Sequence, residues 1–316
     1  MTEQGQTAGT TTLPETAPGS PPRPGQASPP QPVAPGAPVP PTQGSASLVA
    51  RRPGREESDP HRSKVVRRRI ELALGIAVPI LLLVGWEVAS KSGALDQLFF
   101  PAPSDLWSTG ANLYSSGEVE RLLGVSFRRV VEGFFLGSAA GLLIGVGLGS
   151  SRVMRAALQP LVYALWTIPK LALLPLLLLF FGLGETPVIL LIAIECMFLV
   201  LIPTITAIVS VPLPYTEAAL SFGASRWQML RYVTIPAALP QMFVALRLSA
   251  GASVLVMVAA EYVDGKSGIG FFIFNSWQLF ATKQMYIGIL TVSVAGAAFT
   301  ILVSGIGSYF TRWQRV

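Results

Sequence analysis

The chain has 316 residues, of which 51% are hydrophobic and only 13% are charged, and its mean hydropathy is +0.55. Soluble domains are about one quarter charged, so this composition excludes an ordinary soluble globular protein. The formal net charge of +6 lies mainly beside apolar stretches, where lipid and topology explain it, and it does not indicate nucleic-acid binding.

The first 60 residues differ from the rest of the chain. Residues 1–60 hold 14 of the 26 prolines, seven glycines and no aromatic residue. Such a segment cannot bury enough apolar surface to offset its ordering entropy, so we predict a disordered, Pro-rich cytoplasmic tail. A Pro-rich ligand for a partner domain is the alternative to a plain tail. The basic segment 61–69 (HRSKVVRRR) abuts the first apolar stretch and is predicted to lie at the membrane surface.

Six apolar stretches follow. Each is about 20 residues or longer, the length that a helix needs to cross roughly 30 Å of hydrocarbon. They predict membrane-spanning helices at 70–90, 124–149, 159–181, 187–210, 240–262 and 285–309. The predicted fold class is therefore all-α and polytopic, with a six-helix transmembrane domain over residues 70–316.

The placement of lysine and arginine predicts the orientation of these spans, because cytoplasmic loops carry an excess of both residues. With the N-terminus inside, the inner side collects eleven and the outer side six. The inner set is Arg62, Lys64, Arg67, Arg68, Arg69, Arg152, Arg155, Arg226, Arg231, Arg312 and Arg315, and the outer set is Lys91, Arg121, Arg128, Arg129, Lys266 and Lys283. We therefore predict a multi-pass protein of a bacterial cell membrane with both termini in the cytoplasm. Arg128 and Arg129 are expected at the outer interface or on a water-filled path.

The second span carries glycines at every fourth position, Gly133, Gly137, Gly141 and Gly145. Residues four apart share one helix face, and the missing side chains let another backbone approach closely. This pattern predicts a tight helix-packing face and says nothing about a solute.

Span three contains two prolines and a lysine. Pro169 and Pro175 each remove a backbone donor and predict bends. Lys170 lies beside the first bend within an apolar run, where a charge must face the bundle interior or a wet path. Two interpretations stay open: Lys170 assists an anionic solute, or it pairs with a carboxylate such as Glu195 in span four.

Span five carries two further charges, Arg247 and Glu261, which are fourteen residues apart and so are not a local pair. We place Lys170, Glu195, Arg247 and Glu261 as candidates for a substrate path. After span five, Gly265, Gly268 and Gly270 break the helix, and the following apolar run IGFFIFNSW is too short to span. It predicts a re-entrant or surface-lying segment on the outer side.

No catalytic or metal-binding pattern occurs in the sequence. The single histidine, His61, lies in the basic segment, and the single cysteine, Cys196, lies within an apolar run and excludes an internal disulfide. The sequence contains no GxSxG, HExxH or GxxxxGK[ST] motif. We therefore predict that the chain is not an enzyme and binds no metal or cofactor, so that any ATP hydrolysis occurs in another subunit.

A polar segment, residues 212–240, lies between spans four and five. Pro212 and Pro214 favour a fresh helix, for which Thr216 is predicted as the cap and Glu217 as an acidic residue of the first turn. Gly223 then ends this short helix, and a second helical piece leads into span five. Small residues would let the first helix fit a narrow groove on another protein. An ordinary interfacial helix is the alternative.

Segment 212–240 also carries a sequence signature. Glu217-Ala218-Ala219, Gly223 and Val233-x-Ile235-Pro236 resemble the pattern EAA-x3-G-x9-I-x-L-P of permease subunits of binding-protein-dependent ABC importers, with Val233 for Ile and Ile235 for Leu. IPKLALLPLLLLFFGLGETPVI (168–189) and AEYVDGKSGIG (260–270) strengthen the likeness. Residues 70–316 are together similar to the permeases for nitrate, sulfonate and taurine.

The resemblance implies a type I ABC importer permease fold and a coupling function for segment 212–240. Its ATPase-coupling residues would be Glu217, Ala218, Ala219, Leu220 and Gly223, with the helix seated in a groove of an ATP-binding cassette ATPase. ATP and Mg would bind that ATPase and not this chain. An extracytoplasmic solute-binding protein and a second permease copy are the other implied partners.

The implied solute is a small anion such as an aliphatic sulfonate, taurine or nitrate. Related permeases also serve other small solutes, such as bicarbonate or pyrimidine and thiamine precursors, and these stay open. A channel or carrier outside the ABC class would need no polar coupling segment. An integral-membrane enzyme would need convergent polar groups inside the bundle, whereas the sequence offers scattered single charges.

Overall fold

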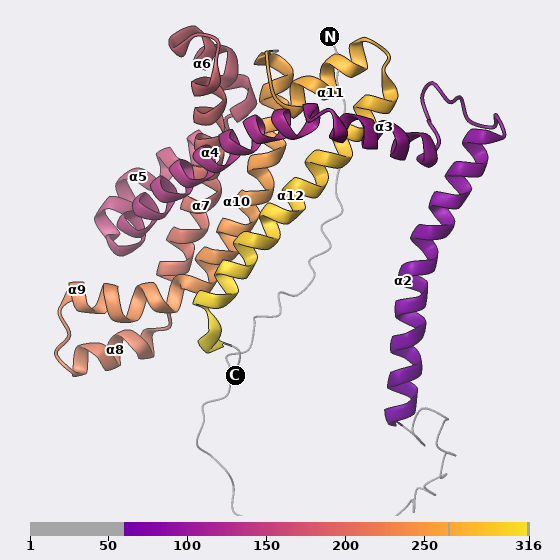
Figure 1. The fold of residues 1–316 in the computed structure, drawn as a ribbon. Helices are drawn as coiled ribbons and strands as arrows, with labels where there is room; N and C mark the ends of the chain where they lie inside the picture. Colours follow the sequence, from indigo (N-terminus) through magenta and orange to yellow (C-terminus); the bar gives the residue numbers. More distant parts are fainter. Residues whose placement is uncertain (1–59, 265, 315–316) are drawn as a thin grey trace, which may run out of the picture. The chain divides into compact units, whose positions relative to one another are not determined.

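The computed structural model describes residues 60–264 and 266–314, and every regular element in these two ranges is helical (Figure 1). The predicted tail lies outside the described residues apart from Pro60, as do the side chains of the basic segment 61–69. The contacts below belong to the unit Val66–Val316. The helices are α2 (Pro60–Lys91), α3 (Pro103–Ser115), α4 (Glu118–Ser150), α5 (Arg152–Trp166), η1 (Lys170–Leu173), α6 (Leu174–Phe181), α7 (Glu185–Val209), α8 (Leu213–Ser221), α9 (Arg226–Met229), η2 (Leu230–Thr234), α10 (Ile235–Asp264), α11 (Ile269–Gln278), α12 (Thr282–Phe310) and η3 (Arg312–Gln314).

Five of the predicted spans are continuous helices in the described residues. The stretches Ile70–Lys91, Glu118–Ser150, Glu185–Val209, Arg226–Val263 and Thr282–Phe310 are each long and apolar enough to cross a membrane. The second begins at Glu118, six residues before its predicted start, directly after Gly117, which has a φ of +72°. A sixth span requires α5 and the η1–α6 stretch to be taken together.

Span three is broken and not merely bent as predicted. Its two halves, Arg152–Trp166 and Lys170–Phe181, meet at 85° across the residues around Pro169. Pro169 has an extended backbone (φ −66°, ψ 105°) at the start of η1, and a proline cannot donate the hydrogen bond that would continue α5. Pro175 makes no break because it lies in the first turn of α6, where the N–H would be unpaired anyway.

The long helices α4, α7, α10 and α12 form the core of the bundle (Figure 1). α4 lies against α7, α7 against α10, and α10 against α12. The glycine face of α4 meets α7 at close range: a Cβ added to Gly133 would lie 2.7 Å from Ile192 Cβ, and one on Gly145 would lie 2.7 Å from Thr204 Cβ. Cβ atoms added to Gly137 and Gly141 would overlap the carbonyl groups of Ala193 and Met197.

Two short helices complete the end of the bundle at which α4 begins. α11 contains the IGFFIFNSW run and buries Ile269, Phe272 and Ile273 against α10, α12 and α4, so it is packed into the protein and does not lie on the surface. α3 lies against α12 and α4. α3 was not among the predicted helices; it starts with Pro103 in its first turn, after an extended Ala102.

Candidate functional site

Segment 212–240 forms a helical hairpin at the end of the bundle opposite α3 and α11 (Figure 1). α8 ends at Ser221, and Gly223 makes the turn with a φ of +77°, a conformation that costs other residues energy but not glycine. Ser225 then starts α9 with a capping box, in which its hydroxyl accepts from Gln228 N and the Gln228 side chain accepts from Ser225 N. α9 passes through the π-turn η2 into α10.

The start of α8 differs from the prediction. α8 begins at Leu213, with Pro214 in its first turn and Pro212 as its N-cap, so Thr216 is not the cap and Glu217 is not in the first turn. The Thr216 hydroxyl instead donates to Leu213 O at 2.8 Å inside the helix. The prolines fix the start here, because their backbone geometry suits a first turn without any side-chain cap.

The outer surface of this hairpin is apolar as well as polar. α8 has no buried residue, and Phe222, at the turn, is 90% exposed. Leu220 and Trp227 are also exposed, whereas Ala219 is half-buried. Exposed apolar side chains of this size suit a surface that another molecule covers, either a protein or the lipid interface.

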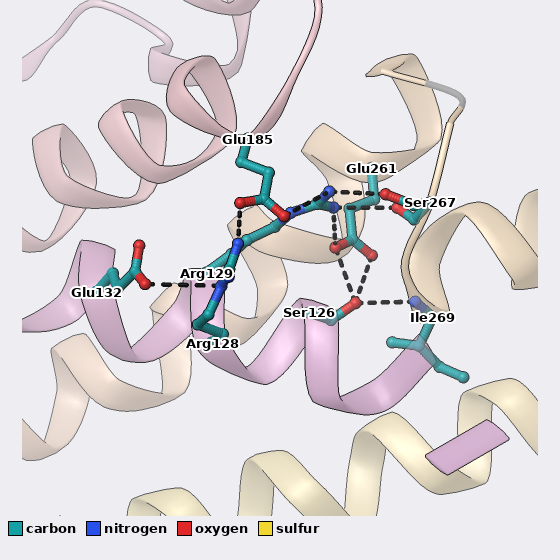
Figure 2. A network of polar contacts seen from close by, with 8 residues as sticks. All are labelled: Ser126, Arg128, Arg129, Glu132, Glu185, Glu261, Ser267 and Ile269. Atoms are coloured by element: carbon teal, nitrogen blue, oxygen red, sulfur yellow. Dashed lines mark hydrogen bonds and ion pairs between the residues drawn. The ribbon is translucent and has the colours of Figure 1, made fainter. Parts of the chain in front are cut away.

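A buried polar network lies at the opposite end of the bundle (Figure 2). Arg129 of α4 is 2% exposed, and its Nη1 atom lies 2.8 Å from Oε1 of Glu261 of α10, which is fully buried. Ser126 donates to the same carboxylate at 2.8 Å, as does Gly270 N. A buried ion pair needs such additional hydrogen bonds, because both charges have lost their hydration.

The same network ties the glycine-rich loop to α4. Arg129 donates to Ser267 O (3.0 Å) and to Ser267 Oγ (2.8 Å), and Ser126 Oγ accepts from Ile269 N at 2.8 Å. Gly268 and Gly270 are needed here, because a Cβ at Gly268 would overlap the Glu261 carboxylate and one at Gly270 would lie 2.9 Å from Glu261 Cβ. The network thereby joins α4, α10 and the start of α11.

The neighbouring arginine has a different environment. Arg128 is half-exposed and pairs with Glu185 at the start of α7 and with Glu132 at 3.6 Å (Figure 2). Glu185 lies 4.0 Å from Arg129 as well. Arg129 is therefore not at an open interface or on a water-filled path, as the sequence suggested, but inside the protein.

The four residues expected on a substrate path are not brought together by direct contacts. In the described ranges no hydrogen bond or ion pair joins any two of Lys170, Glu195, Arg247 and Glu261. Glu261 belongs to the buried network. Glu195 is half-buried on α7.

Lys170 has a partner that the sequence did not suggest. Its Nζ donates to Trp166 O at 2.6 Å and lies 3.9 Å from the centroid of the Trp166 ring. A lysine at a helix end satisfies an orphan carbonyl and interacts favourably with the helix dipole. The ammonium thus stabilises the end of α5 at the break, and no carboxylate pairs with it in the structure as described.

Arg247 lies in a groove between α10 and α12. The groove has a volume of about 640 Å³. Most of its lining is apolar, from Gly251, Val254, Leu255 and Val258 of α10 and Val292 and Gly296 of α12, among others. The residues on its wall that carry polar side chains are Arg247, Tyr262, Ser293, Thr300 and Ser304.

The described residues contain no group of three or more histidine, cysteine, aspartate or glutamate side chains that could hold a metal ion. Cys196 is buried, and its Sγ lies 3.8 Å from Ser249 O.

Comparison with known proteins identifies the family. Residues 137–316 match the family described as "Binding-protein-dependent transport system inner membrane component". The chain is 32% identical to the putative aliphatic sulfonates transport permease protein SsuC of Bacillus subtilis (strain 168), over 80% of this chain and 92% of that protein. It is 30% identical to the taurine transport system permease protein TauC of Escherichia coli (strain K12), over 78% of this chain and 91% of that protein.

A solved structure has the same fold. The chain superposes on a chain of the MetNI methionine ABC transporter in an inward-facing conformation with a TM-score of 0.53 and 18% identity, over 60% of this chain and 95% of that one. The predicted all-α, type I importer permease fold is therefore confirmed. The family match covers more than half of the chain, and both relatives are matched over nearly their whole length. This multi-pass membrane protein belongs to the family of inner membrane components of binding-protein-dependent transport systems.

Proposed function

We propose that this permease forms the translocation pathway for a small anionic solute, an aliphatic sulfonate, taurine or nitrate, and couples it to a separate ATPase. As an ABC permease subunit the chain is not itself an enzyme. The observation that carries the coupling half of the proposal is the exposed hairpin of α8 and α9. The anionic solute is supported by the positive charge of Arg247 on the α10–α12 groove, and by the names of the sulfonate and taurine relatives.

The hairpin has the properties of a mechanical contact. α8 has no fully buried residue, so its exposed apolar side chains gain stability only against another molecule. The hairpin is joined to the bundle at both ends, to α7 through residues 210–212 and to α10 through α9 and η2. A cavity lies between it and the ends of α4 and α7, lined by Gly149, Ile208, Trp227 and Leu230, among others. A push on α8 would therefore act on both α7 and α10.

The partners follow from this arrangement as part of the proposal. Two ATP-binding cassette ATPase subunits would hold ATP and Mg, with α8 of each permease in a groove of one ATPase, while this chain binds no cofactor. A second copy of the permease and an extracytoplasmic solute-binding protein would complete the importer. Segment 212–240 and both termini would then face the cytoplasm, in agreement with the distribution of lysine and arginine.

A crosslink tests the coupling contact. In a Cys196→Ala background, Ala219→Cys is expected to crosslink to a cysteine in the groove of the co-expressed ATPase, because Ala219 is a small, half-exposed residue of a helix that has no fully buried residue. Ser116→Cys, exposed and directly after α3 at the other end of the bundle, is the matched control and should give no product. Crosslinking of Ser116→Cys alone would show that the membrane orientation is the opposite of the proposed one. Crosslinking of neither variant would contradict the coupling contact.

Replacing the exposed phenylalanine at the turn tests the same contact energetically. Phe222→Asp is expected to weaken ATPase association in detergent by about tenfold or more, as loss of a buried aromatic anchor does. The level of the permease in the membrane should not change, since Phe222 is 90% exposed on the chain itself. Association at wild-type affinity would show that the turn lies outside the interface.

A further inference from the structure

We propose that the α10–α12 groove is an oxoanion-binding station of the translocation pathway, with Arg247 as its counter-charge and Thr300 and Ser304 as its hydroxyl donors. This inference rests on the proposed function and adds to it a place and a set of ligands for the solute.

The depth of Arg247 is the first observation. It lies seven residues beyond Pro240, where segment 212–240 ends, so it is about 10 Å along the helix inside span five. An arginine side chain reaches less than about 7 Å, so the Arg247 guanidinium stays about 3 Å or more inside the span even when the side chain extends toward that end.

The exposure of Arg247 is the second observation. Its side chain is exposed, and no hydrogen bond or ion pair of the described residues engages it. This contrasts with Arg129, which is buried and is paired with Glu261 and Ser267. A free charge within an apolar span is costly in lipid and is found facing a wet path or a partner.

The register of the two helices places hydroxyls beside this charge. A Cβ at Gly296 would lie 3.2 Å from Val254, one at Gly251 would lie 3.8 Å from Thr300 Oγ1, and one at Gly307 would lie 3.0 Å from Phe243. α10 and α12 thus run antiparallel. Residues 254, 251 and 243 of α10 lie opposite residues 296, 300 and 307 of α12, respectively. In this register Arg247 lies opposite Ser304, and both line the groove.

The hydroxyls are available to a ligand at little cost. Thr300 Oγ1 donates to Gly296 O at 2.9 Å and Ser304 Oγ donates to Thr300 O at 2.7 Å, and both acceptors are carbonyls within α12. Such carbonyls already accept a helical N–H, so a hydroxyl can rotate toward an anion without leaving a buried group unpaired.

The lining also selects the class of anion. A guanidinium offers a planar fork of donors that matches two oxygens of a sulfonate, nitrate or carboxylate. Arg247 is the one charged group among the residues that line the groove, and the other walls are largely apolar. The groove therefore suits a small oxoanion with a single charged group and a short apolar body.

Two thiol reagents of opposite charge test this inference, whatever the identity of the imported solute. In the assembled transporter carrying Cys196→Ala, Ser304→Cys is treated with 2-sulfonatoethyl methanethiosulfonate, itself a two-carbon sulfonate, or with the trimethylammonium analogue. Each rate is divided by that of the same reagent with free 2-mercaptoethanol. We expect labelling by both, with the anionic reagent favoured about tenfold by the nearby positive charge.

The charge is then removed in the same background. Adding Arg247→Met should abolish the preference for the anionic reagent, and Arg247→Lys should keep most of it. Leu302→Cys, on α12 outside the groove and 58% exposed, is the matched control and should remain unlabelled in lipid. Thr300→Cys provides a second reporter if Ser304→Cys lowers the amount of transporter.

The possible results separate this inference from the proposed function. Two results would contradict the oxoanion-binding station if ATPase association is intact: absence of labelling at residues 300 and 304, or a preference for the anionic reagent that Arg247→Met does not change. Loss of ATPase association by the wild-type chain would instead count against the proposed function. A preference that depends on Arg247 supports the station whichever oxoanion the transporter imports.

Discussion

Arg129→Met is expected to lower the free energy of unfolding by about 3–5 kcal/mol, which is the cost of leaving a buried charge without its partner. The Glu261 carboxylate is fully buried, and Arg129 is its only cationic partner among the described residues. The substitution also removes both side-chain donors to Ser267. The loop that leads into α11 should therefore loosen as well.

The native cysteine supplies the measurement. Cys196 is fully buried, so its reaction with a maleimide dye during heating reports unfolding. Arg128→Met is the matched control, because Arg128 also contacts two glutamates but is half-exposed. A loss of less than about 1 kcal/mol is expected there, since exposed ion pairs contribute little.

A double variant distinguishes an unpaired charge from lost packing. Arg129→Met combined with Glu261→Gln removes both charges, so it should be more stable than Arg129→Met alone by about 1–3 kcal/mol. A double variant less stable than both single variants would show that packing of the two side chains dominates. Equal losses in the free energy of unfolding for Arg128→Met and Arg129→Met would mean that the network is hydrated.

Local features of the sequence predicted much of this fold. Runs of apolar residues located the spans, since a single helix of sufficient length carries that signal by itself. Gly223 and the flanking prolines predicted the hairpin of segment 212–240, because turn geometry is also local. The break at Pro169 was underestimated, because a proline permits a kink or a full break and the neighbouring helices decide between them.

Pairings between distant residues were not predictable in this way. Arg129 and Glu261 are 132 residues apart, and each has only the sequence signal of a charge near the end of a span. The spacing of Ser126 and Arg129 by three residues, on one face of α4, was the available hint of a polar site. Their common partner, a carboxylate beside a glycine-rich loop, becomes visible only when α4 and α10 are packed together.

Lys170 and Arg247 also show that the sequence alone does not reveal whether a charge within a span has a partner. Both are single positive charges within apolar runs, so both were equally good candidates for a substrate path. The structure separates them: Lys170 is engaged by Trp166, and Arg247 has no partner in the parts described. The difference comes from the break in span three, which provides Lys170 with an exposed helix end.

Gly137→Ala is expected to lower the free energy of unfolding by about 3 kcal/mol, near the upper end of the usual cost of overpacking. A Cβ at this position would overlap the carbonyl group of Ala193, so α4 and α7 would have to move apart. Separation of the two helices would weaken packing along the whole glycine face, including Gly133, Gly141 and Gly145. Transport should fall with the amount of folded permease in the membrane.

Two further variants make this prediction specific to the backbone of α7. Gly124→Ala, on an exposed part of α4 with nothing within 4 Å, should be neutral or stabilising by up to about 1 kcal/mol, because alanine favours a helix over glycine. Ala193→Gly should fail to rescue Gly137→Ala, since the obstructing atoms are the carbonyl group of residue 193 and not its methyl group. Rescue by Ala193→Gly would contradict the close approach of the two backbones and place the contact between side chains.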